Sequence, residues 1–236
     1  NPLHDTYLLS RSMHQISESN MTDTRSTSPA PRFVSHAATR TAAVLAAAAL
    51  GLLPALASAH VGVDGHHHPG FAMGFMHPVT GLDHLAAMLA VGLWSALSAR
   101  RAWPDLLWAP LGFAGMLLVG AVLGLQGLAI PAVEPMIAAS LLVIGLLAAS
   151  RVHLPAPASA ALVGLFAVFH GVAHGYELAG EAGAFSTLAG MLCATLVLHL
   201  CGVAIGWSLR QGHALVPRAA GLAVAALGTV MLAQMA

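Results

Sequence analysis

The sequence has no lysine and few charges of either sign. Apart from histidine, its only basic residues are nine arginines, and charged residues make up 8% of the 236 positions, against about 25% in soluble domains. Apolar residues make up 58%, which is the composition of an integral membrane protein. The formal net charge is zero, so the chain lacks the excess positive charge by which proteins bind nucleic acid.

Cysteine is also scarce, with Cys193 and Cys201 the only two. On a helix they would lie about 12 Å apart, which is too far for a disulfide. Neither is on the helix face of Thr195 and His199, so we expect both to be packing residues. The chain has no ATP-binding motif, so ATP-driven transport would need another subunit. It also lacks the His-Glu-x-x-His motif of zinc metalloproteases.

The N-terminal part is predicted to fall outside the membrane domain. Residues 1–40 are polar and without apolar periodicity, and we expect them to be disordered. Residues 41–59 combine a basic flank, a short apolar run and an Ala-Ser-Ala ending, which is typical of a secretory signal peptide. Cleavage after Ala59 would leave His60 at the mature N-terminus; an uncleaved first membrane helix is the alternative.

A short polar segment, 60–70, follows and carries several metal-binding side chains. We predict that it lies in the periplasm, where it either collects a divalent metal or forms a flexible loop. If His60 is the mature N-terminus, its free amine beside the imidazole favours the metal interpretation. The candidate ligands in this segment are His60, Asp64, His66, His67 and His68.

The remainder, 71–236, is predicted to be an all-α domain of six transmembrane helices. A span needs ~20 apolar residues, and such segments in lipid must be helices because each backbone polar group has to be paired. The expected spans are 71–98, 106–128, 133–150, 158–176, 184–208 and 215–235.

The arginines of this domain predict its orientation. All of them follow the first, third or fifth span, and arginine-bearing loops face the cytoplasm. The mature N- and C-termini are therefore expected in the periplasm of a bacterial inner-membrane protein. These residues are Arg100, Arg101, Arg151, Arg210 and Arg218.

The same count of spans allows a three-plus-three inverted repeat, a plan common in transporters. Residues 114–117 and 189–192 both read Ala-Gly-Met-Leu, which is weak support for such a repeat.

Histidine, in contrast to lysine, is abundant, and the 14 histidines outnumber either class of charge. Two clusters lie in apolar segments, the stretch 77–84 (HPVTGLDH) and the stretch 170–177 (HGVAHGYE). A charged group at the centre of a membrane helix costs roughly 2.5–3.5 kcal/mol, so ionisable groups at that depth indicate function. We predict that the two clusters form a metal path.

In the first cluster, Pro78 disfavours a helical conformation for the residue before it. We therefore expect His77 to cap a helix that begins at Pro78, with Asp83 and His84 on its second turn. If the chain before Pro78 is helical instead, His77 and His84 share one helix face.

In the second cluster, His170, His174 and Glu177 lie on one helical stripe. His199, one turn after Thr195, adds a group from a third helix. A single histidine of this kind is more often a helix-packing residue than a ligand, but the combination favours a pathway for metal or protons. Imidazole and carboxylate suit nickel, cobalt or zinc.

These motifs resemble those of the HupE/UreJ family of nickel/cobalt transporters. The first resembles its first-helix signature, Phe169 to Glu177 is similar to its second, and Thr195 to Gly202 resembles its fifth-helix pattern. The resemblance implies uptake of nickel or cobalt, as cargo rather than as cofactor, across the bacterial inner membrane. It also implies a set of metal-pathway residues, namely His77, Asp83, His84, His170, His174, Glu177 and, less directly, His199.

Two other functions stay open from the sequence. The same ligands suit an intramembrane metal-dependent enzyme, which would need a general base and a substrate route, or a metal-binding accessory protein without transport. A non-enzymatic permease is the prediction we favour, because six spans with almost no soluble domain fit it best. The sequence does not distinguish nickel from cobalt and does not fix the oligomeric state.

Overall fold

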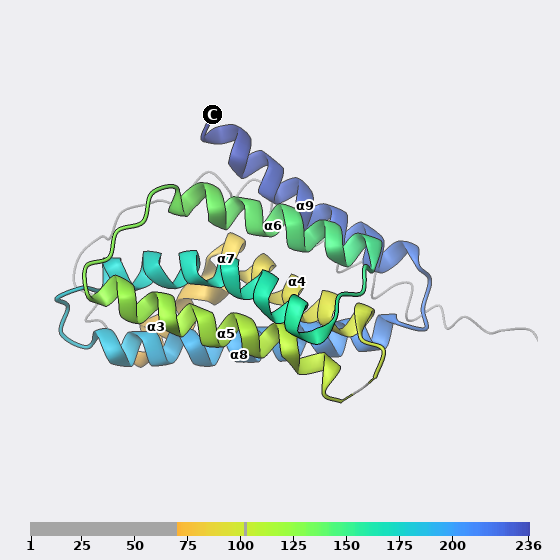
Figure 1. The fold of residues 1–236 in the computed structure, drawn as a ribbon, viewed down its shortest axis with the longest axis horizontal. Helices are drawn as coiled ribbons and strands as arrows, with labels where there is room; N and C mark the ends of the chain where they lie inside the picture. The colour runs from red at the N-terminus through yellow and green to blue at the C-terminus, as the bar shows by residue number, and fades with distance from the viewer. Residues whose placement is uncertain (1–69, 102) are drawn as a thin grey trace, which may run out of the picture. The chain divides into compact units, whose positions relative to one another are not determined.

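The computed structural model describes residues 70–101 and 103–236, and all regular structure within them is α-helical (Figure 1). The predicted extension at 1–40, the signal peptide at 41–59 and His60 lie outside these residues, as does the segment 60–70 except for its last residue. The helices are α3 (Phe71–Thr80), α4 (Leu82–Ser98), α5 (Asp105–Leu125), α6 (Val133–Ser150), α7 (Ala156–Glu177), α8 (Ala184–Leu209) and α9 (Leu215–Gln234).

Five of these helices, α5 to α9, are long and apolar enough to cross a membrane. The helices α3 and α4 make a sixth span only when they are taken together, because the chain bends by 80° between them. The prediction of an all-helical membrane protein is therefore confirmed, with five spans or six if the bent pair counts as one.

The start of the first span differs from the expectation. His77 does not cap a helix that begins at Pro78, because α3 begins at Phe71 and contains both residues. The break comes at Gly81, whose extended backbone (ψ 112°) separates the two helices. Pro78 lies in the last turn of α3, where it cannot donate the backbone hydrogen bond that other residues donate to the fourth residue before them.

Helices pack in pairs through glycines that let their backbones approach closely. The pair α5·α7 is parallel, since Gly112 lies against Ala160 and Gly120 against Val172. The pair α4·α8 is parallel too, with Leu89 beside Gly202 and Leu93 beside Gly206. Small residues at such contacts are typical of membrane helices.

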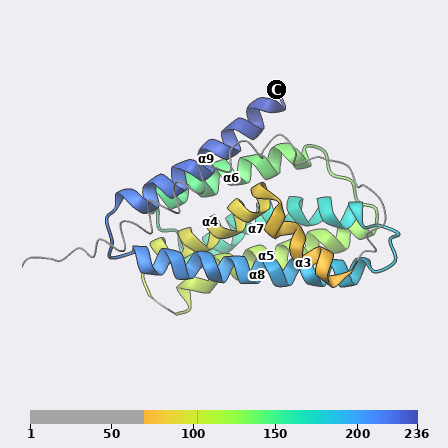
Figure 2. The same ribbon diagram turned by 180° about the vertical axis from the view of Figure 1, so that it is seen from behind.

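The third pair, α6·α9, is antiparallel and lies side by side in both views (Figures 1 and 2). A Cβ atom added to Gly145 would lie 2.9 Å from the Cα of Ala225, and one added to Gly221 would lie 2.9 Å from the Cα of Ala149. The two glycines therefore make equivalent close contacts, each with the backbone of the other helix.

The ends of α4, α6 and α8 meet at one end of the bundle. Arg210 Nη2 donates to the carbonyl of Ala99 (2.7 Å), and Trp94 Nε1 donates to the carbonyl of Val152 (2.9 Å). We call this the arginine end, because it gathers Arg100, Arg101, Arg151 and Arg210.

Two details of the sequence analysis fail. Cys193 and Cys201 are exposed rather than packed, because they project from α8 away from its neighbours. The matching segments 114–117 and 189–192 occupy different environments: a Cβ at Gly115 meets nothing within 4 Å, whereas one at Gly190 meets the backbone of α3. Their identity is therefore not a structural correspondence.

Candidate metal centre

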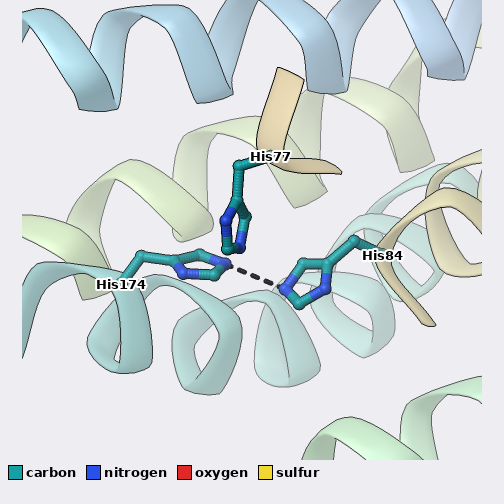
Figure 3. A group of neighbouring side chains, drawn as sticks. All are labelled: His77, His84 and His174. Atoms are coloured by element: carbon teal, nitrogen blue, oxygen red, sulfur yellow. Dashed lines mark hydrogen bonds between the residues drawn. The ribbon is translucent and has the colours of Figure 1, made fainter. Parts of the chain in front are cut away.

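Three histidine side chains from three helices converge on one point (Figure 3). Their ligand nitrogens all lie within 4.8 Å of one another, and the Nε2 atoms of His84 and His174 are 2.9 Å apart. The ring of His77 stands nearly perpendicular to that of His174, with centroids 4.8 Å apart. We refer to His77, His84 and His174 as the histidine triad.

The bend between α3 and α4 brings the first two members of the triad together. His77 lies in the last turn of α3 and His84 in the first turn of α4, so the 80° bend folds one over the other. Gly81 leaves room for this arrangement, because a Cβ there would lie 3.2 Å from Asp83 Oδ1 and 3.3 Å from His84 Nδ1. The third member, His174, comes from the last turn of α7.

Two triad histidines have a carboxylate near the outer nitrogen. His84 Nδ1 lies 2.9 Å from Asp83 Oδ1, so the carboxylate accepts from Nδ1–H, fixes the tautomer of that ring and leaves Nε2 as the ligand atom, which is the usual support for a metal-binding histidine. Glu177 Oε2 lies 3.6 Å from His174 Nδ1, which is too far for a hydrogen bond, and this nitrogen is buried without a hydrogen-bond partner.

The two facing Nε2 atoms then suit one ion. Two imidazole nitrogens that bind one ion at about 2.1 Å each, at right angles, are about 3.0 Å apart. The observed 2.9 Å between His84 and His174 is close to this separation. Without an ion, the same separation suits a hydrogen bond from Nε2–H of His174 to Nε2 of His84, whose proton is on Nδ1 beside Asp83.

The triad borders a small cavity of about 10 Å³. This volume has room for a bare ion or about one water molecule. Its lining combines the three imidazoles with apolar side chains and one hydroxyl, and consists of His77, Pro78, His84, Met88, Leu117, His174, Met191 and Thr195.

His170 lies beside the triad but is not among the histidines whose ligand nitrogens lie within 4.8 Å of one another. Its ring packs edge-on against His84, with centroids 5.3 Å apart, while its Nε2 lies 3.2 Å from the hydroxyl of Ser140 on α6. The other nitrogen, Nδ1, is buried without a hydrogen-bond partner. His170 is therefore adjacent to the site through its ring.

His199 is separated from the triad. Its side chain is 1% exposed, and neither ring nitrogen has a hydrogen-bond partner. The ring of Phe113 lies against it at 5.3 Å and against His170 at 5.5 Å, so the phenyl ring stands between these two histidines. The structure thus brings together five of the predicted residues with His170 at their edge, and it leaves His199 apart.

The sequence analysis missed three residues that shape the site: Ser140, Phe113 and Gly81. Ser140 could have been found, because it is the single polar side chain in the middle of its apolar span. Phe113 carried no such signal, since one aromatic residue among many apolar residues does not reveal what it faces.

Comparison with known proteins agrees with the histidine motifs. The family profile described as "HupE / UreJ protein" matches residues 47–231. The chain is 43% identical over 183 residues to a protein named "Protein HupE" from Rhizobium leguminosarum bv. viciae, which covers 76% of this chain and 92% of that protein. The comparison with solved structures gave no match. The chain belongs to the HupE/UreJ family.

Proposed function

We propose that this protein is a permease that takes up nickel or cobalt ions across the bacterial inner membrane. The observation that carries the proposal is the histidine triad, in which two Nε2 atoms face each other at 2.9 Å while Asp83 holds the outer nitrogen of His84. Membership of a family generally linked to nickel and cobalt uptake supports the same function.

The triad supplies what a divalent ion needs in order to enter the bundle. The ion must exchange its water shell for protein ligands, and neutral imidazole suits nickel and cobalt. Because histidine binds metal only in its neutral form, binding competes with protons. Asp83 positions the ring of His84, and Glu177 places a negative charge 3.6 Å from the ring of His174. The unpaired nitrogens of His170 and His199 are the candidates for later ligands along the path.

The orientation follows from the arginine end, which we place in the cytoplasm. Ser98, the last residue of α4, and Ala156, the first residue of α7, lie at the arginine end. His84 and His174 lie at the other ends of these two helices, so the triad lies toward the periplasmic side. A cleaved signal peptide at 41–59 and a periplasmic His-rich segment at 60–70 remain part of this proposal.

We also propose that the domain is a three-plus-three inverted repeat. In this repeat, a two-fold rotation exchanges α4 with α7, α5 with α8 and α6 with α9. The rotation places the α4·α8 pair on the α7·α5 pair. It places the antiparallel α6·α9 pair on itself. The glycine contacts support this, because they correspond in the same register on both sides. The equivalent glycines are Gly92 and Gly171, Gly202 and Gly120, and Gly145 and Gly221.

The size of the triad cavity favours transport over an enzymatic role. A volume of about 10 Å³ accepts an ion but has no space for an organic substrate. The seven packed helices of the described residues, joined by short connections, also favour a path through the bundle over a binding site alone.

The test is uptake of radioactive nickel by cells that express the full chain, with cobalt and zinc as competitors. We expect His84→Ala and His174→Ala to abolish uptake, because each removes one of the two facing nitrogens. His213→Ala is the matched control, since His213 is an exposed histidine in the loop between α8 and α9. All variants must reach the membrane in equal amounts.

The result that overturns the proposal is the absence of nickel, cobalt and zinc uptake from a wild-type chain that is expressed and inserted. Nickel binding without flux in proteoliposomes would then favour the accessory protein. Undiminished uptake in His84→Ala would remove the triad from the path even if the chain transports nickel.

A further inference from the structure

A second cavity lies at the arginine end, at the opposite ends of the helices that carry the triad. It is larger, about 90 Å³, which is room for several water molecules. Its wall is polar where the triad cavity is mostly apolar. The lining residues with side-chain oxygen or nitrogen ligands are Asp105, His153, Ser95, Ser98 and Ser159.

His153 is held in a tautomer that can bind a cation. Its Nδ1 lies 2.9 Å from the carbonyl of Ser98, and a carbonyl can only accept, so Nδ1 carries the proton. The other nitrogen, Nε2, is then the one with the free lone pair. Histidine ligands of metal ions are commonly fixed in this way by a backbone carbonyl.

Asp105 supplies a carboxylate on the same cavity wall. It is the first residue of α5, and its Oδ2 accepts from the backbone N–H of Arg101 at 3.1 Å. Within the described part of the chain, its other oxygen has no hydrogen-bond partner. Among the described residues that line the cavity there is no arginine to repel a cation; the guanidinium of Arg210 is turned to Ala99 and to the ring of Trp207.

The inverted repeat relates this cavity to the triad cavity. In the register set by the glycine contacts, His174 corresponds to Ser95, Glu177 to Ser98, and Met191 to Ala109. All three counterparts line the second cavity. The two cavities therefore occupy equivalent positions in the two halves of the proposed repeat. The triad cavity is lined by strong metal ligands, and the second cavity by weaker ones.

An apolar layer separates the two cavities. Met88 lines the first, Trp94 lines the second, and both pack with Phe113 in one core in which all three side chains are almost fully buried. An ion cannot cross this layer in the present arrangement, so the two cavities are separate.

From these observations we propose that the second cavity is a divalent-cation site with His153 and Asp105 as ligands, at which the transported ion is released. The release role rests on the proposed permease function. A site with one imidazole, one carboxylate and hydroxyls holds nickel or cobalt more weakly than the triad does, as release requires.

The first experiment measures how many nickel ions the purified full-length protein binds in equilibrium dialysis, carried to saturation. We expect the double variant His153→Asn/Asp105→Asn to bind one ion fewer than the wild type. Asn at 153 keeps a donor near the position of Nδ1 and removes Nε2. Any nickel held by His66, His67 and His68 is common to both proteins and cancels in the difference.

A matched variant and a folding check accompany this measurement. His213→Asn changes an exposed histidine of a loop that contributes nothing to the cavity lining, and it should bind as many ions as the wild type. Adding His84→Ala to the double variant should remove one more ion, which requires that the double variant is folded. Equal binding by the wild type and a folded double variant would overturn the site.

The second experiment measures nickel flux in proteoliposomes. We expect the double variant to lower the maximal rate by roughly tenfold, a loss typical for removal of a group that supports metal binding, with nickel affinity at the triad unchanged. An unchanged rate would overturn the release role. A wild type that moves no nickel would reject the permease instead, and the dialysis result would still decide whether the second site exists.

Discussion

At the scale of residues, one carboxylate determines which nitrogen of a triad histidine is free. Asp83 accepts from Nδ1–H of His84 at 2.9 Å, whereas Glu177 lies 3.6 Å from His174 Nδ1 and makes no hydrogen bond to it. Asp83 also lies in the first turn of α4, where the helix dipole favours a negative charge. Metal affinity should therefore depend on groups that do not themselves face the ion.

Asp83→Asn should lower the affinity for nickel by roughly 10–100-fold, the usual effect of removing the support of a metal-binding histidine. The amide keeps the shape of the side chain but loses its charge. Isothermal titration calorimetry of the purified protein measures the effect. Glu181→Gln, which changes an exposed carboxylate beyond α7, is the control, and equal affinities for both variants would contradict the role of Asp83.

Gly81 acts through the space that its missing side chain leaves. Its φ of −76° is open to any residue, but a Cβ would press on both Asp83 and His84. We expect Gly81→Ala to weaken nickel binding by about as much as Asp83→Asn, because it pushes the same pair apart, while the protein stays folded. Calorimetry with a thermal-melting check measures both; normal affinity in the variant would show that the pair tolerates the methyl group.

The residues of the site were predicted from the sequence more fully than their arrangement. Spacing on one helix placed His170, His174 and Glu177 together, because a helix has a fixed period. It could not separate His174, which joins the triad, from His170, which turns its Nε2 to Ser140. That difference depends on which helices pack against α7, and this information is not local.

At the scale of elements, glycine contacts decide how closely the helices approach. Gly120 on α5 lies against the backbone of α7, whereas a Cβ added at Gly115, five residues earlier on the same helix, would meet nothing within 4 Å. The two glycines are thus a matched pair on one helix with opposite environments.

Gly120→Ala should lower the melting temperature in detergent, since overpacking a tight contact costs about 1–3 kcal/mol. Gly115→Ala should leave it unchanged or raise it, because alanine is favoured over glycine in a helix by about 1 kcal/mol. Light-scattering or fluorescence-detected melting of both variants provides the comparison. A larger loss at Gly115 than at Gly120 would contradict the packing described here.

Helix ends were predictable because apolar runs stop at polar or glycine-rich breaks; each expected span ends within three residues of a helix end. The bend at Gly81 was not predictable in this way. Proline interrupts helices more strongly than glycine does, which pointed to Pro78. However, α3 continues through Pro78, and the chain turns three residues later. Tertiary contacts of α3 with the start of α8, where Gly74 meets the backbone of Thr187, hold the short helix in place.

At the scale of the whole molecule, arginine side chains gather at one end of the helix bundle. The ends of α4, α6 and α8 meet at the arginine end, and the hydrogen bonds from Arg210 and Trp94 tie them together. The positive-inside rule then gives the orientation in the membrane.

Alkaline phosphatase, which folds only in the periplasm, should be active when it is fused after Ala236 and inactive when it is fused after Arg151 or Arg210. Green fluorescent protein at the same positions should give the reverse pattern. An active phosphatase at Arg151 would invert the proposed topology and exchange the roles of the two cavities.

The triad is divided between two glycine-packed pairs. His77 and His84 belong to the α3–α4 segment that packs on α8, and His174 belongs to α7, which packs on α5. Each pair is held rigidly by its backbone contacts, so a displacement of one pair against the other changes the distance between the facing nitrogens directly. If the triad binds an ion as proposed, the ion would join the two helix pairs, and any movement that separated the pairs would also weaken their hold on the ion.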